Sequence, residues 1–384
     1  MKQILLFIAL LAISGVKAQP TFVPEDLSYD LRIHQRDIGL VGKVLSMGQF
    51  VKWTNSDLEP SEACYEYDTD VYEEQHYING YAYPLKGHTP CIDLLKEQMF
   101  ALQFSDEGYA TFFHWETPKV ESNSQFFKYG PRDSDEATYN WSDNHTIESI
   151  DCKSFGFDKK FQLSYDNQGR LVEKGVLMDR RSSEFVYPTT YEYDNQGRVI
   201  KATTTPTHKG KPSKHIQTRN YNYSYEGTNL VVMSVCACLN EDHNKERRTR
   251  WVYDSNNHLI EQRIDIYGIK NNKVYYSKIV INEYDEDGQL VKTNKNSLNI
   301  GGYYGATTPD IAENLLKNHG KKIVTTFAYN DHGDLDEVQT SSTGIINITN
   351  YEYKYDPHGN WVRRTMTIDD VLASVVTREI HYQE

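Results

Sequence analysis

The stretch Tyr193-Asp194-Asn195-Gln196-Gly197-Arg198-Val199 is one copy of a tract, Tyr-Asp-x-x-Gly-x-(Leu/Val), that recurs along this chain. The alternation Tyr191-x-Tyr193 that leads into it places both rings on one face of a β-strand. The aspartate side chain accepts hydrogen bonds from amides just ahead of it in a turn, and glycine adopts a positive φ at little cost. Each copy therefore predicts a strand, a tight turn and a second strand, which together form a β-hairpin.

The tract returns often enough to predict a repeat architecture. Clear copies begin at Tyr165, Tyr193, Tyr284 and Tyr355, and looser copies begin at Phe104, Trp141, Tyr225, Tyr253 and Tyr329. From the copy at 165 to the copy at 284, successive copies begin 28, 32, 28 and 31 residues apart. A lone hairpin is only marginally stable in water, so consecutive hairpins are expected to pair edge to edge.

The tract and its spacing resemble the YD repeats of the Rhs family, most closely its short secreted versions from Bacteroidetes-type bacteria. The resemblance covers roughly residues 160–365 and implies an array of β-hairpins, without by itself implying an activity. We therefore expect an all-β fold, an elongated and twisted antiparallel sheet of consecutive hairpins with two short helical insertions. A single array is expected to occupy residues 19–384, with its lead strand between Leu40 and Trp53.

The N-terminus has the features of a secretion signal. Lys2 gives a positive start, Ile4 to Ile13 is a ten-residue apolar run, and Val16-Lys17-Ala18 has the small residues that a signal peptidase needs. We expect residues 1–18 to be a signal peptide and the mature protein to be exported to the periplasm, the outer surface or the extracellular space. The apolar run is too short for a bilayer, which needs about 20 residues, and we expect no membrane span elsewhere.

The charge balance limits the classes of partner. The full chain has a formal net charge of −13, and removal of residues 1–18 takes away two lysines and no acid, which leaves −15. Such acidity argues against nucleic acid and against anionic membrane surfaces as partners. Its simplest interpretation is that it maintains solubility.

Two insertions, at about residues 54–98 and 296–322, interrupt the repeats and echo each other. Each holds a loop rich in Gly and Tyr followed by Thr-Pro, which is a helix start because Thr can cap and Pro fits the first helical position. In the second insertion Ile311 and Leu315 lie four apart on one helical face, and Gly320 marks the expected end. Each insertion therefore predicts a loop and a short amphipathic helix.

The tyrosines of these loops, Tyr81, Tyr83, Tyr303 and Tyr304, are the candidate ligand-binding residues. A tyrosine ring can stack on a sugar or anchor a protein partner while its hydroxyl forms hydrogen bonds. We therefore interpret the chain as a secreted or envelope-associated binding or scaffold protein whose ligand is a glycan or another surface protein. The alternative is structural, with the helices covering an open end or face of the sheet and the rings packed beneath them.

Five cysteines are an odd number for an oxidising compartment. Cys64 and Cys91 flank part of the first insertion and could form a disulfide that closes it. Cys236 and Cys238 lie two apart on an expected strand and share a face, which suits packing or a cross-strand disulfide. A metal site there would need more ligands than His243.

Catalytic and cofactor-binding motifs are absent from the sequence, which has no His-Glu-x-x-His, phosphate-binding Gly loop, Gly-x-Ser-x-Gly elbow or dinucleotide fingerprint. No cofactor or metal is expected, and an enzyme is the less favoured interpretation. A secreted carbohydrate-active hydrolase is the alternative, with clusters such as Asp133-x-Asp135-Glu136 or Asp334-x-Asp336-Glu337 as the source of an acid pair. An accessory component of a secretion locus is a third interpretation.

Signal peptidase is expected to cleave between Ala18 and Gln19, because the small residues at 16 and 18 fit its recognition site. Intact-mass measurement on protein from the native envelope fraction tests this directly. A mass that still includes residues 1–18 would contradict export.

Overall fold

The computed structural model describes residue 35 and residues 39–53, 99–116, 134–142, 147–154, 157–180, 183–186, 188–205, 207–208, 211–212, 216–236 and 245–383. Within these ranges the chain forms one antiparallel sheet and two helices. The strands of the first half are β1 (Val44–Trp53), β2 (Met99–Phe104), β3 (Ala110–Glu116), β4 (Ser134–Trp141), β5 (Ile147–Ser154), β6 (Phe157–Tyr165), β7 (Leu171–Arg180), β8 (Ser183–Val186), β9 (Thr189–Tyr193), β10 (Val199–Thr204), β11 (Thr207–His208) and β12 (Lys211–Pro212).

The second half is described almost without interruption. Its elements are β13 (Gln217–Glu226), β14 (Asn229–Cys236), β15 (Lys245–Tyr253), β16 (Leu259–Gly268), β17 (Val274–Tyr284), β18 (Leu290–Asn299), α4 (Ile300–Tyr303), α5 (Pro309–His319), β19 (Lys321–Tyr329), β20 (Leu335–Ser342), β21 (Ile345–Tyr355), β22 (Trp361–Ile368) and β23 (Val371–Tyr382).

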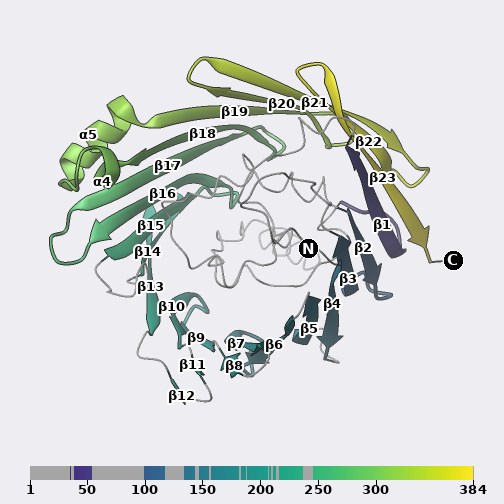
Figure 1. The fold of residues 1–384 in the computed structure, drawn as a ribbon, viewed down its shortest axis with the longest axis horizontal. Helices are drawn as coiled ribbons and strands as arrows, with labels where there is room; N and C mark the ends of the chain where they lie inside the picture. Colours follow the sequence, from purple (N-terminus) through teal and green to yellow (C-terminus); the bar gives the residue numbers. More distant parts are fainter. Residues whose placement is uncertain are drawn as a thin grey trace, which may run out of the picture.

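Twenty of the strands close into an antiparallel barrel (Figure 1). Strands follow one another around the ring in chain order, and β8, β11 and β12 form a small side extension joined to β7. The ring closes because β1 pairs with both β2 and the last strand, β23. The expected all-β array of hairpins is confirmed, but the expected elongated sheet is wrong. The array bends through a full turn, so its first and last strands satisfy each other's hydrogen bonds.

The tracts whose turns the structure describes form the tight turn that their sequence predicts. In the copy at 193, the amide of Gly197 donates to the carbonyl of Asp194, and the amide of Asp194 donates to the carbonyl of Arg198. The Asp194 carboxylate accepts the amides of Gln196 and Arg198, both at 2.9 Å. Gly197 has a φ of +79°, in the left-handed region that glycine reaches without strain. These turns all lie at one end of the barrel, called the turn rim; the opposite end is called the helix rim.

An aromatic donor joins most of the described hairpins to the one before. The Tyr193 hydroxyl donates at 2.6 Å to the carbonyl of Leu171, the residue that opens the second strand of the preceding hairpin. Burial raises the pKa of Tyr193 and of Tyr223, which keeps both hydroxyls protonated donors. Among the described residues the same bond, at 2.6 to 3.1 Å, joins Trp141 to Ala110, Tyr165 to Ile147, Tyr193 to Leu171, Tyr223 to Val199, Tyr284 to Leu259, Tyr329 to Leu290 and Tyr353 to Leu335.

The two faces of the barrel wall differ in character. Tyr221, Val232 and Trp251 share one face by their register, and all three are buried in an apolar cluster. Helix α5 packs on the opposite face, and Figure 1 shows it at the outer edge of the ring. The buried aromatic face therefore points inward. Ion pairs lie along the strands of the outward face, as in Lys201–Glu192 and Lys292–Glu283, both at 2.8 Å or less.

The closing seam, where β1 pairs with β23, is also held by hydrogen bonds from the last copy of the tract, the one at 355. The Asn360 side chain accepts the amide of Val41 at 2.7 Å and donates to the carbonyl of Val41 at 2.8 Å. It also donates to the hydroxyl of Tyr382, which itself donates to the carboxylate of Asp356. Burial and this bond to Asp356 raise the pKa of Tyr382 to about 12. One buried amide thus joins the start of the barrel to its last turn.

We expect Gly197→Val to destabilise the protein. A Cβ at this position would meet nothing within 4 Å, so the cost comes from the positive φ alone and not from a clash. A loss on the order of 1–3 kcal/mol in the free energy of unfolding is expected. The matched variant is Gln196→Ala in the same turn, where we expect a change within about 0.5 kcal/mol. Urea denaturation compares the two, and equal midpoints would contradict the turn assignment.

We expect Asn360→Ala to weaken the seam, because it strips both backbone partners from Val41. An unsatisfied buried polar group costs roughly 1–3 kcal/mol, so the free energy of unfolding should fall by about 2 kcal/mol or more. Gln289 holds the same position in the tract at 284, and its side-chain oxygen has no hydrogen-bond partner. Gln289→Ala is therefore the control and should be nearly neutral.

Hydrogen exchange locates the effect of Asn360→Ala within the barrel. Faster exchange confined to the amides of β1 and β23 is expected. A loss spread evenly over all strands, or no loss at all, would argue against a localised closing role for Asn360.

Candidate binding surface at the helix rim

Helix α4 is a short, firmly capped turn at the helix rim. The side chain of Asn299 accepts the amide of Gly302 at 2.9 Å, and the amide of Tyr304 donates to the carbonyl of Ile300. Ile300 is fully buried and anchors α4 in an apolar cluster under α5. The backbone of the Gly-Gly-Tyr-Tyr segment is therefore held from both ends.

Helix α5 begins at the expected Thr308-Pro309 and packs through Ala312 and Leu316. The Asn296 side chain on β18 donates to the carbonyl of Leu316 at 3.0 Å, which ties the end of the helix to the wall. Ile311 is 52% exposed, so of the expected face through Ile311 and Leu315 only Leu315 packs against the wall. The small side chain of Ala312 brings the helix against the sheet, and this turns Ile311 toward solvent.

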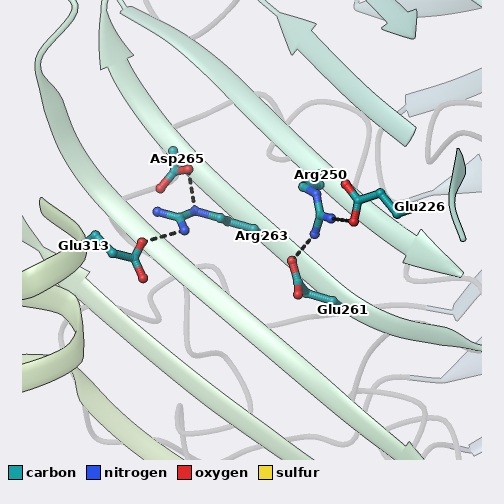
Figure 2. Close-up of polar contacts among 6 residues, drawn as sticks. All are labelled: Glu226, Arg250, Glu261, Arg263, Asp265 and Glu313. Atoms are coloured by element: carbon teal, nitrogen blue, oxygen red, sulfur yellow. Dashed lines mark hydrogen bonds and ion pairs between the residues drawn. The ribbon is translucent and has the colours of Figure 1, made fainter. Parts of the chain in front are cut away.

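Two charged clusters lie on the outward face of the wall, and one of them reaches α5 (Figure 2). Arg263 on β16 donates to Asp265 at 2.8 Å and forms an ion pair with Glu313 of α5 at 2.6 Å. Burial would lower the pKa of Arg263, but these two carboxylates outweigh it and raise the pKa above its ordinary value. Next to it, Arg250 lies between Glu226 and Glu261. Arg263 thus remains a cation that holds α5 to the outward face.

Tyr303 and Tyr304 are the expected site residues that the structure describes, and both rings point into solvent. Tyr303 is 78% exposed and Tyr304 is 51% exposed. Their ring centroids lie 6.5 Å apart, and Tyr304 also lies 5.8 Å from the ring of His319 at the end of α5. The alternative, in which these two rings pack beneath the helices, is therefore wrong for Tyr303 and Tyr304.

A third tyrosine, which sequence reasoning missed, adjoins α4. The ammonium of Lys245 lies 4.7 Å from the ring centroid of Tyr275. A Cβ on Gly301 would lie 3.0 Å from this ring, so the missing side chain of Gly301 lets α4 approach it closely. The sequence signal was the polar run Lys270-Asn271-Asn272-Lys273 between two strands, which marks a hairpin tip at the same rim.

The hairpin tip and the loop between the helices are bonded to each other. The amide of Val274 donates to the carbonyl of Thr307 at 2.7 Å, and the amide of Thr307 donates back at 3.2 Å. Because Lys273 precedes Val274, the tip at 269–273 and the Tyr303–Tyr304 segment form one continuous surface.

The remaining candidate residues, Tyr81, Tyr83, Cys64 and Cys91, lie outside the described residues. The strand ends that flank the first insertion, Trp53 of β1 and Met99 of β2, lie at the helix rim. Figure 1 shows β1 and β2 across the ring from α4 and α5. The two insertions therefore leave the wall at one rim, on opposite sides of it, and their joint surface stays a prediction. Cys236 is disulfide-bonded, which agrees with one of its two expected roles.

Within the described part of the chain, no group of three or more His, Cys, Asp and Glu side chains is arranged to hold a metal ion. Asp334, one of the acids considered for a hydrolase, accepts a hydrogen bond at 2.9 Å from the hydroxyl of Tyr355, at the end of β21. No helix of the described residues combines the length and apolar character needed to cross a membrane.

Comparison with known proteins gives no family. No family model matches the chain, and no curated protein matches it. Among solved structures, a porin-like protein from Bacteroides vulgatus is 15% identical over 62% of this chain and 98% of its own, with a TM-score of 0.25. A porin-like protein from Bacteroides uniformis is 11% identical over 54% and 95%, with a TM-score of 0.20. The Photorhabdus luminescens Tc holotoxin pore is 9% identical over 76% and 20%, with a TM-score of 0.21. Similarities this low assign neither a family nor a function to the chain.

Proposed function

We propose that this protein is an exported scaffold that binds a glycan at the helix rim. The observation that carries the proposal is the exposure of Tyr303 and Tyr304, at 78% and 51%, on a backbone that is capped, bonded to a hairpin tip and braced by α5. Exposed aromatic rings on a rigid support are typical of binding sites, because little conformational entropy is lost when they take a ligand.

A glycan suits this surface better than an extended apolar partner. Tyr303 and Tyr304 offer ring faces for stacking, and the neighbouring Asn271 and His319 offer polar groups at the surface. A protein partner remains the alternative ligand from the same reasoning, and the binding experiment separates the two. The resemblance to YD repeats is compatible with either, since it concerns the hairpin array that carries the surface.

The charged side chains on the outward face of the barrel wall favour a wall that is in contact with water. Ion pairs such as Lys201–Glu192, Lys292–Glu283 and Arg263–Asp265 occupy outward positions along the strands. A wall facing lipid would carry an apolar band there, and a lysine or arginine at its centre would cost roughly 2–4 kcal/mol. We infer that the barrel wall faces an aqueous compartment outside the cytoplasm, consistent with the secretion signal at residues 1–18.

A glycan array probed with the mature protein and with a Tyr303→Ala/Tyr304→Ala variant tests the proposal. We expect the native protein to bind a defined set of glycans. The variant should lose more than about 1 kcal/mol of binding free energy, which is roughly fivefold in affinity, with an unchanged melting temperature.

The matched control is Tyr225→Ala, which removes a tyrosine of similar exposure, 48%, from the turn rim. It should leave glycan binding intact. A native protein that binds no glycan, or a Tyr303→Ala/Tyr304→Ala variant that binds as well as the native protein, would contradict the proposal.

A further inference from the structure

One part of the helix rim combines lysines with tyrosines on a chain that is acidic as a whole. We call it the basic aromatic rim, and it consists of Lys245, Lys270, Lys273, Tyr275, Tyr303 and Tyr304. The formal net charge of the chain is −13, whereas the segment from Gly268 to Tyr276 carries two lysines and no acid. Positive charge is thus gathered where the exposed rings lie.

Two of the described acids near this surface are paired with arginines. Glu246 pairs with Arg248, and Glu313 pairs with Arg263. Asp310 is the exposed acid at the start of α5. Lys270 and Lys273 are exposed, and neither forms an ion pair within the described part of the chain. The formal charge of the hairpin tip itself is therefore positive.

The same residues are placed for recognition by the fold. Lys245 lies over one side of the Tyr275 ring, and Gly301 of α4 approaches that ring closely. Arg248 donates to the side chain of Asn272 at 3.1 Å, which fixes the tip between Lys270 and Lys273. The backbone pairing of Val274 with Thr307 then joins this tip to the Tyr303–Tyr304 segment. Charges and rings therefore lie on one supported surface.

We propose that the basic aromatic rim binds an anionic polysaccharide, one whose sugars carry carboxylate or sulfate groups. The tyrosine rings stack on the sugars, and the lysine ammonium groups pair with the anionic substituents as point charges. A neutral glycan would leave Lys270 and Lys273 without a role. This inference rests on the proposed function and adds the chemical class of the ligand.

The test compares charged and neutral probes with the full mature protein. Dextran sulfate and dextran differ by the sulfate groups, and polygalacturonate supplies carboxylates. We expect binding to at least one polyanion, little binding to dextran, and weakening when salt rises from about 0.1 M to about 1 M, because the Debye length falls from about 10 Å to about 3 Å. Sulfate and carboxylate ligands are distinguished by which of the two polyanions binds more tightly.

A charge-reversal pair locates the site. Lys270→Glu/Lys273→Glu should weaken polyanion binding by about tenfold or more. Lys43→Glu/Lys354→Glu makes the same change in net charge at exposed lysines near the turn rim and should have little effect. Melting curves check the fold of each variant, and Lys270→Gln/Lys273→Gln replaces the first pair if reversal prevents folding.

The outcomes separate this inference from the function on which it rests. Equal losses in the two charge-reversal variants would show attraction to net charge alone and would overturn the inference. Tight binding of a neutral glycan that depends on Tyr303 and Tyr304 but not on the lysines would leave the proposed function standing and overturn the anionic ligand. A protein that binds no polysaccharide of either kind would overturn both.

Discussion

The hydrogen bond from a half-buried tyrosine hydroxyl to a carbonyl of the preceding hairpin is the interaction on which this barrel depends. A hairpin alone is marginal in water, and its edges offer ladder bonds without fixing which residues pair. The Tyr223 hydroxyl reaches the carbonyl of Val199, the residue that opens the second strand of the hairpin before it. The donor and the acceptor of this bond each lie within a copy of the tract. The repeated tract therefore sets the register between any two neighbouring hairpins that form the bond.

The turn and the bond act as one unit. Asp194 holds the guanidinium of Arg198 at 2.7 Å, and that guanidinium lies 4.5 Å from the ring centroid of Tyr223. Arg170 lies over Tyr193 in the same way. The aspartate therefore closes its own turn and also positions the cation that covers the next tyrosine. This explains why Tyr, Asp and Gly recur together: each is needed for the hairpin and for its neighbour.

Much of this was predictable from the sequence because it is local. Alternating tyrosines, the Asp-x-x-Gly turn and the Thr308-Pro309 helix start each depend on contacts within a few residues. Closure was not predictable in the same way. It depends on Asn360 meeting the backbone of Val41, which lies 319 residues away, and nothing in the tract at 355 marks that partner. An open array and a closed barrel would have the same hairpin repeats. They differ only in the accumulated bend of the sheet and in the contacts of this seam.

The packing face of α5 failed as a sequence prediction for a related reason. Helix α5 has two overlapping apolar faces, formed by Ile311, Ala312, Leu315 and Leu316. The face that packs against the wall is the one that contains Ala312, the smallest of these side chains. The exposure of Tyr303 and Tyr304 likewise follows from how α4 meets Tyr275, which is a contact between separate hairpins. Local signals found the helices and the rings. The direction in which each faces was set by the sheet beneath.

The two rims carry different constraints, and this bears on where a binding surface can lie. At the turn rim the carboxylates, glycines and most of the rings of the clear tracts are already engaged in turns and in joining hairpins, as at Asp166 and Tyr193. A change there alters the wall. At the helix rim the connections need only link one strand to the next, so they vary from the short tip at 269–273 to the two helices between β18 and β19. Binding residues are often found on loops that a rigid scaffold holds in place. The basic aromatic rim lies on such connections.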